Sequence, residues 1–210
     1  FVTIPVEYQL SLEAKFPAAV HNIKAAIRWV KANSRKYHID TGRIAVFGCS
    51  AGGQLAALTG LTNNIPFFEG HQGVTATDSN RVNNSNVSAI VDIDGVLNFL
   101  APESLNLKRK PNSADVFWLG GTFENKPEVW KKASPIYWAT EHTAIPMLFI
   151  NSGFPRFHAG QDELISMMHR WEVYTQVEKV DIQMHPFWLF HPWVDKTVVW
   201  TAAFLHKVLP

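Results

Sequence analysis

The stretch Gly48-Cys49-Ser50-Ala51-Gly52-Gly53 stands between a short apolar run, 44–47, and a helix-like run, 54–62. A G-x-S-x-G string in that context is typical of a sharp strand-to-helix turn that holds a serine with its hydroxyl exposed. The string alone is common, so the strand before it and the helix after it give it its specificity. These residues predict that Ser50 is a nucleophile presented at the end of a strand.

The glycines of this stretch predict close backbone contacts. We expect glycine at Gly48 and Gly52 because a β-carbon at either position would crowd the strained turn or the neighbouring strand. Gly53 follows where the new helix must begin close against the sheet. The local geometry therefore predicts that all three positions exclude a side chain.

Strand-like and helix-like segments alternate along the chain. Helices are predicted by apolar residues three and four positions apart, as at Val20, Ile23, Ile27 and Val30. The expected strands are 1–8, 43–47, 86–94, 146–151 and 180–184, and the expected helices are 17–33, 54–62, 161–174 and 197–208. This order predicts an α/β fold, a mostly parallel sheet with helices on both faces. The active site of such a sheet lies beyond the carboxyl ends of its strands.

Two stretches interrupt the alternation. Residues 63–85 are polar and read as a loop, and residues 98–140 predict excursions and short helices rather than a second domain. With 210 residues, the chain is expected to form one domain, 1–210.

Composition excludes several function classes. The chain is 47% hydrophobic and 18% charged with a net charge of +1, which gives no basis for binding nucleic acid or an anionic membrane surface. Its single cysteine, Cys49, is expected to be a small buried hydrophobic residue. No His, Cys or acidic cluster has the spacing of a metal site, and no cofactor is expected.

The elbow and the residues before it, 40–47, resemble α/β-hydrolase esterases, closest to the hormone-sensitive-lipase-like and carbohydrate-esterase branches. Two later segments, PRFHAG at 155–160 and HPFWLF at 185–190, are similar to bacterial acetyl-xylan and pectin acetyl esterases. The resemblance implies a serine carboxylesterase acting through an acyl-enzyme. Its substrate would be a short-chain, acetyl-type ester, such as an acetylated plant polysaccharide, and the protein would then be secreted or periplasmic.

A serine nucleophile needs a base and an acid that orients the base. In this fold they follow in the order Ser, Asp or Glu, His. Asp162 is the predicted acid because a glycine two residues before it matches the esterase pattern. Glu163 is the alternative acid, and both residues also fit an ordinary acidic first turn of a helix.

His185 is the predicted base because it follows the last expected strand and its surroundings resemble those of the esterase histidine. His191 is the alternative base. The neighbouring Phe187 and Trp188 are candidates for a pocket wall, although they equally fit packing of the last helix onto the sheet.

One oxyanion donor can be identified, the backbone N–H of Ala51. The second donor expected from the resemblance, on a glycine-rich loop after an earlier strand, is not found. The chain opens with Phe1 rather than Met, so we expect an N-terminally incomplete domain that lacks its first strands. A missing segment or a partner chain would then supply them. The alternatives to an esterase are a catalytically silent binding domain and a peptidase of the same fold.

Overall fold

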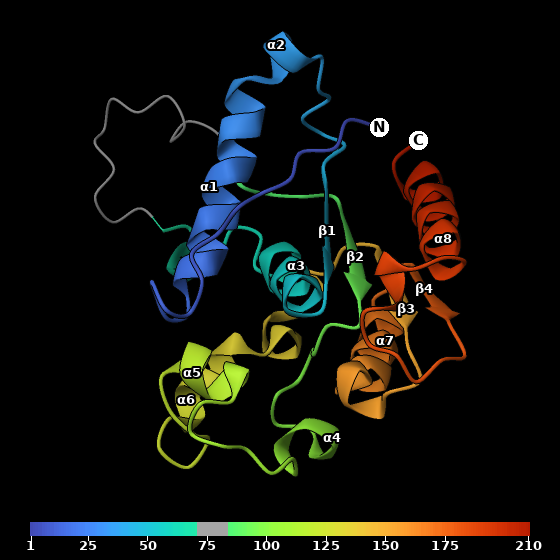
Figure 1. Cartoon of the computed structure of the whole chain (residues 1–210). Coiled ribbons are helices and arrows are strands. Elements are labelled where there is room, and N and C mark those ends of the chain that lie inside the picture. Colours follow the sequence, from blue (N-terminus) through green and yellow to red (C-terminus); the bar gives the residue numbers. More distant parts are fainter. Residues whose placement is uncertain (71–83) are drawn as a thin grey trace.

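The computed structural model describes residues 1–70 and 84–210. Its centre is a parallel four-stranded sheet in the order β1-β2-β3-β4 (Figure 1). The strands are β1 (Ala45–Cys49), β2 (Ala89–Ile93), β3 (Met147–Asn151) and β4 (Thr175–Lys179). The expected α/β fold with a parallel sheet is confirmed.

The register of the sheet brings the ends of its strands together. Cys49 at the end of β1 pairs with Ile93 at the end of β2, and Ile93 lies opposite Ile150 of β3. Every residue of β2 and β3 is buried, as expected for central strands of a parallel sheet. The residues directly after these strands therefore lie next to one another along one edge of the sheet.

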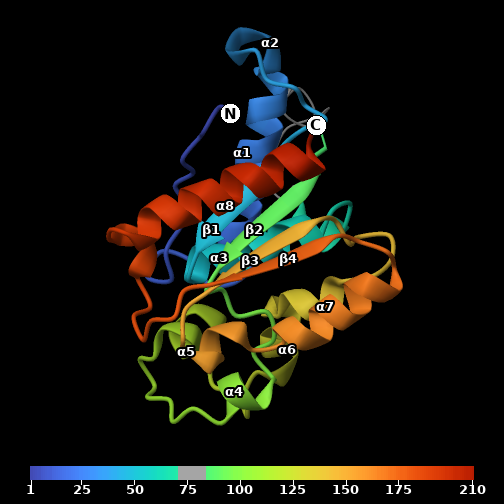
Figure 2. The ribbon, with the colours of Figure 1, turned by 90° about the vertical axis from the view of Figure 1, so that its right-hand side faces the viewer.

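Helices cover both faces of the sheet, as the alternating pattern predicts (Figure 2). α3 (Ala51–Leu61) and α7 (Gln161–Arg170) lie on one face, where Ile90 and Phe149 join their buried side chains. α8 (Trp193–Val208) lies on the other face, where its Phe204 packs on the alternate residues of β2 and β3. This arrangement makes α3, the helix of the elbow, part of the core.

α1 (Ala18–Ala32) forms an outer layer against α3. The apolar face predicted for it is the one it buries, with Val20, Ile23 and Ile27 in one cluster with residues of α3. A single turn, α2 (Ser34–Tyr37), follows it. The helix at 17–33 is thus confirmed to within one residue at each end.

The long segment 98–140 contains short helices, as expected. They are α4 (Pro102–Leu105), α5 (Ala114–Leu119), α6 (Pro127–Ala133) and the 3-10 turn η3 (Pro135–Trp138). The fully buried Trp130 holds this region together, with its indole N–H donated to the Gly121 carbonyl at 2.9 Å. In the expected loop 63–85, the described part contains the 3-10 turn η1 (Pro66–Phe68), and residues 71–83 lie outside the described residues.

The strand expected at residues 1–8 is absent. This segment forms no strand in the structure, and Phe1 and Val2 are 71% and 61% exposed. Its apolar residues are not buried against the sheet, so no packing favours strand pairing. Among the described residues β1 consequently has no neighbour on its outer edge, and its Phe47 is 53% exposed.

The last strand is also displaced from its predicted position. The structure forms β4 at Thr175–Lys179, whereas the expected range 180–184 is irregular. The alternating apolar residues of that range have another origin, because Val180, Ile182 and Met184 pack into the cluster under α8. β4 itself is a half-exposed edge strand, which explains why it carries little apolar signal.

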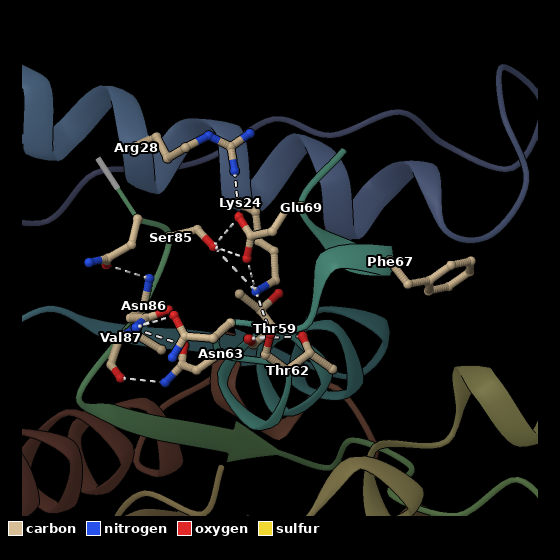
Figure 3. Close-up of polar contacts among 12 residues, drawn as sticks. Lys24, Arg28, Thr59, Thr62, Asn63, Phe67, Glu69, Ser85, Asn86 and Val87 are labelled. Atoms are coloured by element: carbon tan, nitrogen blue, oxygen red, sulfur yellow. Dashed lines mark hydrogen bonds and ion pairs between the residues drawn. The ribbon is translucent and has the colours of Figure 1, made fainter. Parts of the chain in front are cut away.

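A buried ion cluster ties α1 to Glu69 and Ser85 (Figure 3). The Nζ of Lys24, fully buried, donates to the Thr62 carbonyl at 2.8 Å and lies 3.1 Å from Glu69 Oε1. Arg28 donates to the other oxygen of Glu69 at 2.9 Å, and the Ser85 hydroxyl donates to the same carboxylate. Burial would raise the pKa of Glu69, but Lys24, Ser85 and Arg28 outweigh it and lower that pKa.

Candidate active site

The elbow holds Ser50 in a backbone conformation that residues other than glycine rarely adopt. Its φ is 56° and its ψ is −122°, and its N–H donates to the Ile93 carbonyl at 2.7 Å across the strand ends. Such strain concentrates at functional sites and persists only where the surrounding structure enforces it. Ser50 therefore stands at the carboxyl end of β1 and immediately before α3.

The glycines around Ser50 have different roles. A β-carbon at Gly48 would overlap the Gly52 carbonyl, and one at Gly53 would overlap the Asp92 carboxylate. At Gly52 it would meet nothing within 4 Å. The expected steric need for glycine is confirmed at Gly48 and Gly53 and wrong at Gly52, where the turn leaves open space.

A continuous hydrogen-bond chain links Ser50, His185 and an aspartate. The Ser50 hydroxyl lies 2.7 Å from His185 Nε2, and His185 Nδ1 lies 3.0 Å from Asp94 Oδ2. Ser50 follows β1, Asp94 follows β2, and His185 lies in the loop after β4. Parallel strands thus bring three residues far apart in the sequence to one edge of the sheet.

Asp94 is positioned as tightly as Ser50. It also has a positive φ, 52°, and its side chain is fully buried. Its Oδ1 accepts the N–H of Ser152, at the end of β3, at 2.7 Å. Burial would raise the pKa of Asp94, but the neighbouring His158, His185 and Ser152 outweigh burial and lower the pKa. Asp94 is therefore an ionised carboxylate at neutral pH.

The charge of Asp94 determines how the two hydrogen bonds run. An ionised carboxylate can only accept, so the His185 proton sits on Nδ1 and is donated to Asp94. His185 Nε2 is then left with a free lone pair and accepts the Ser50 hydroxyl. This is the direction that a base needs if it is to take a proton from the serine.

The expectation for the acid needs a correction. Asp162 and Glu163 are exposed residues in the first turn of α7, and the carboxylate on His185 is Asp94. The acidic pair behaves as helix-start residues, the alternative that their spacing left open. A signal for Asp94 was present, because it directly follows a buried strand of a parallel sheet, where functional residues gather.

The two histidine candidates are separated by the structure. His185 contacts Ser50, whereas His191 lies 81% exposed and pairs with Asp195 one helical turn later. Phe187 is fully buried in the cluster under α8, so it is a core residue rather than a pocket wall. Trp188 does reach the site, with its ring edge-on to the His185 imidazole at 5.0 Å between centroids.

Two further titratable groups lie at the elbow: the buried Asp92, and Cys49, which is partly exposed rather than buried as expected. Burial, together with the charges of Asp92 and Asp94, raises the pKa of the Cys49 thiol to about 12, so this thiol stays neutral. Burial also raises the pKa of Asp92 well above its ordinary value, although the Gly95 N–H donates to its Oδ1 at 2.8 Å. Cys49 is therefore a neutral thiol within the elbow, and Asp92 packs against Gly53 while it accepts the Gly95 N–H.

The backbone N–H of Ala51 begins α3, a position where an N–H has no partner inside the helix. Within residues 1–70 and 84–210, no three His, Cys, Asp or Glu side chains group so that they could hold a metal ion. No helix in the described ranges has both the length and the apolar character needed to cross a membrane.

The sequence is similar to a known protein family and to curated esterases. The BD-FAE family model matches residues 1–176. Esterase LipC of Mycobacterium tuberculosis is 31% identical over 151 residues, which is 72% of this chain and 36% of LipC. Esterase LipQ of the same organism is 28% identical over 153 residues, 73% of this chain and 34% of LipQ. The chain thus spans about a third of the length of these curated relatives.

Solved structures share the fold at low sequence identity. A truncated carbohydrate esterase from gut microbiota has a TM-score of 0.74 at 22% identity, over 95% of this chain and 73% of that one. An acetyl ester-xyloside bifunctional hydrolase from Caldicellulosiruptor lactoaceticus has a TM-score of 0.75 at 19% identity, over 96% and 70%. With its family match over 176 of 210 residues and this fold, the chain belongs to the BD-FAE family of α/β-hydrolase-fold proteins.

Proposed function

We propose that this chain is a serine carboxylesterase that works through an acyl-enzyme on Ser50. The observation that carries the proposal is the unbroken chain of hydrogen bonds from Ser50 through His185 to Asp94. A serine hydroxyl is a weak nucleophile at its ordinary pKa and needs a base in direct contact. His185 is such a base, and the buried charge of Asp94 stabilises its protonated form.

The reaction then proceeds in two halves. Ser50 Oγ attacks the ester carbonyl while its proton passes to His185 Nε2. His185 returns that proton to the leaving alcohol as the carbon–oxygen bond to the alcohol breaks. Water, activated by the same imidazole, hydrolyses the acyl-serine and restores the hydroxyl. Asp94 keeps the imidazole in the correct tautomer throughout.

The negative oxygen of the tetrahedral intermediate needs donors. The Ala51 N–H is the first donor in this proposal, because it follows the nucleophile and is free of a partner within its helix. A second donor would come from a strand placed on the open outer edge of β1, where Phe47 is exposed. An additional segment or a partner chain would provide that strand. Loss of one such donor costs about a hundredfold to a thousandfold in rate.

The substrate that we propose is a short-chain, acetyl-type ester on a carbohydrate alcohol. Two structural neighbours, a carbohydrate esterase and an acetyl ester-xyloside bifunctional hydrolase, favour this class. Trp188 and Phe157, which flank the His185 ring, provide apolar surface beside the reacting atoms. Sugar rings and short acyl groups both pack well on aromatic faces.

The test is hydrolysis of p-nitrophenyl acetate, with the matching p-nitroanilide as the amide. We expect Ser50-dependent turnover of the ester and none of the amide, with Ser50→Ala and His185→Gln at background. Turnover of the amide would indicate a peptidase instead. A folded protein that binds acetylated xylo-oligosaccharide without any Ser50-dependent turnover would support a silent binding domain and contradict the esterase.

A further inference from the structure

The 3-10 turn η4 (Pro155–His158) lies against the His185–Asp94 pair. The Phe157 ring stacks on the His185 imidazole, with centroids 3.6 Å apart and an interplanar angle of 11°. The next residue, His158, faces Asp94. One short turn after β3 therefore contacts both the predicted base and the carboxylate that orients it.

His158 carries an unsatisfied polar atom at this contact. Its Nε2 is buried, has no hydrogen-bond partner, and lies 3.7 Å from Asp94 Oδ1. Buried nitrogen atoms without partners are rare in folded proteins and call for an explanation. The nearby acceptor is the carboxylate itself, which has one oxygen committed to His185 and the other turned toward His158 and the Ser152 N–H.

We propose that His158 is a positioning residue that donates from Nε2 to Asp94 Oδ1 and so holds the carboxylate in place for His185. Two donors on Oδ1, from His158 and Ser152, prevent the carboxylate from rotating and keep Oδ2 on His185. At 3.7 Å the contact is longer than a hydrogen bond, and such contacts often tighten only when substrate is bound. The buried, unpartnered Nε2 and its direct approach to Oδ1 both fit this role.

The charged surroundings of His158 come from several elements. Asp94 faces it from the end of β2, and His185 lies on the far oxygen of that carboxylate. Arg156 lies two residues earlier in the same turn, with its guanidinium over the Phe157 ring. α4, which packs against the turn, contributes the exposed Glu103. Asp94 is the charged group that lies directly against the buried nitrogen.

The donor has a predictable effect on His185. A donor on Asp94 withdraws part of the negative charge that stabilises the His185 imidazolium. Removing the donor should therefore make the imidazolium more stable, so that His185 titrates at a higher pH. It should also loosen the carboxylate and slow the proton transfer. This inference rests on the proposed function only for the rate, because the titration can be measured without turnover.

The experiment compares three variants of the protein. His158→Phe keeps a ring but removes the donor, His158→Gln keeps an N–H near the Nε2 position, and His142→Phe is a control on an exposed histidine. The readouts are the midpoint of the His185 ring titration by ¹⁵N NMR, and kcat and KM for p-nitrophenyl acetate. Near-ultraviolet circular dichroism checks folding, and His158→Leu replaces His158→Phe if the latter does not fold.

We expect His158→Phe to raise the His185 midpoint by about half a pH unit. It should lower kcat about tenfold with KM within about twofold, the effect of one charge-assisted hydrogen bond. His158→Gln should restore most of both values. An unchanged His185 midpoint in His158→Phe would overturn the proposal, and so would a Gln variant as impaired as the Phe variant. If His158→Phe shifts the His185 midpoint while the wild type shows no Ser50-dependent turnover, the esterase would be refuted and the role of His158 would still be supported.

Discussion

Asp94→Asn is the substitution that tests the assignment of the acid most sharply. Asp94 Oδ1 accepts the Ser152 N–H at 2.7 Å, and Oδ2 faces His185 Nδ1 at 3.0 Å. An asparagine in the same place would keep its oxygen on the Ser152 N–H and turn its NH₂ group toward His185. Two donors would then face each other unless His185 moved its proton from Nδ1 to Nε2.

The consequence for the reaction follows from that tautomer. His185 with its proton on Nε2 has no lone pair to accept the Ser50 proton, so the base is lost while the shape of the site is kept. The matched Asp-to-Asn exchange in other serine triads lowers kcat by about ten-thousandfold. We therefore expect Asp94→Asn to lower kcat for p-nitrophenyl acetate by about a thousandfold or more, with KM little changed.

The control is Asp162→Asn, at the exposed first turn of α7. This residue contacts neither Ser50 nor His185 in the structure, so kcat should remain within about twofold of wild type. The assignment of Asp94 as the acid would be refuted if Asp162→Asn abolished turnover while Asp94→Asn retained it. Equal losses in both variants would also contradict the geometry, because only one carboxylate lies on His185.

Three further predictions concern stability. Gly48→Ala should cost about 3 kcal/mol of unfolding free energy, measured by urea unfolding, because its β-carbon would overlap backbone atoms. Gly52→Ala, in open space, should change that free energy by less than about 1 kcal/mol. Similar losses in both variants would count against the elbow geometry. Lys24→Met removes a fully buried cation and leaves Glu69 with Arg28 and Ser85 alone, so it should cost about 2 to 3 kcal/mol of unfolding free energy. The exposed Lys36→Met should stay within about 0.5 kcal/mol, and a neutral Lys24→Met would show that the cluster adds no stability. Because the pKa of Asp92 is raised in the folded state, its protonation adds stability in full below the ordinary carboxyl pKa and progressively less as pH rises. Asp92→Asn should flatten this decline of the unfolding free energy with pH. Urea unfolding at several pH values would disprove the prediction if the variant declined as steeply as the wild type.

Most of the fold was predictable because its signals are local. The elbow glycines, the periodic face of α1 and the apolar runs of β2 and β3 are each patterns within one short segment, although the contacts that they reflect are made with other elements. Edge strands are harder to recognise from the sequence because they are half exposed and so contain fewer apolar residues. The range 180–184 has apolar alternation without strand pairing, and β4 has strand pairing with little apolar alternation.

The candidate site was predictable in two of its three residues. Ser50 lies in a motif and His185 lies near the end of the last strand, so both have sequence-local markers. The acid depends on which loop end lies closest to the imidazole in space. That distance is set by the register of β1, β2 and β3, which a single sequence does not reveal. His158 lies in the segment 155–160, but no local pattern marks its approach to Asp94.

An activated nucleophile at Ser50 is the central feature of the proposed mechanism. The measurement is peptide mapping by mass spectrometry after treatment of the folded protein with a fluorophosphonate, with Ser50→Ala alongside. We predict a single phosphonyl adduct on the peptide that contains Ser50, with none in the alanine variant. A folded wild-type chain that carries no adduct, or carries it on another residue, would contradict the central claim.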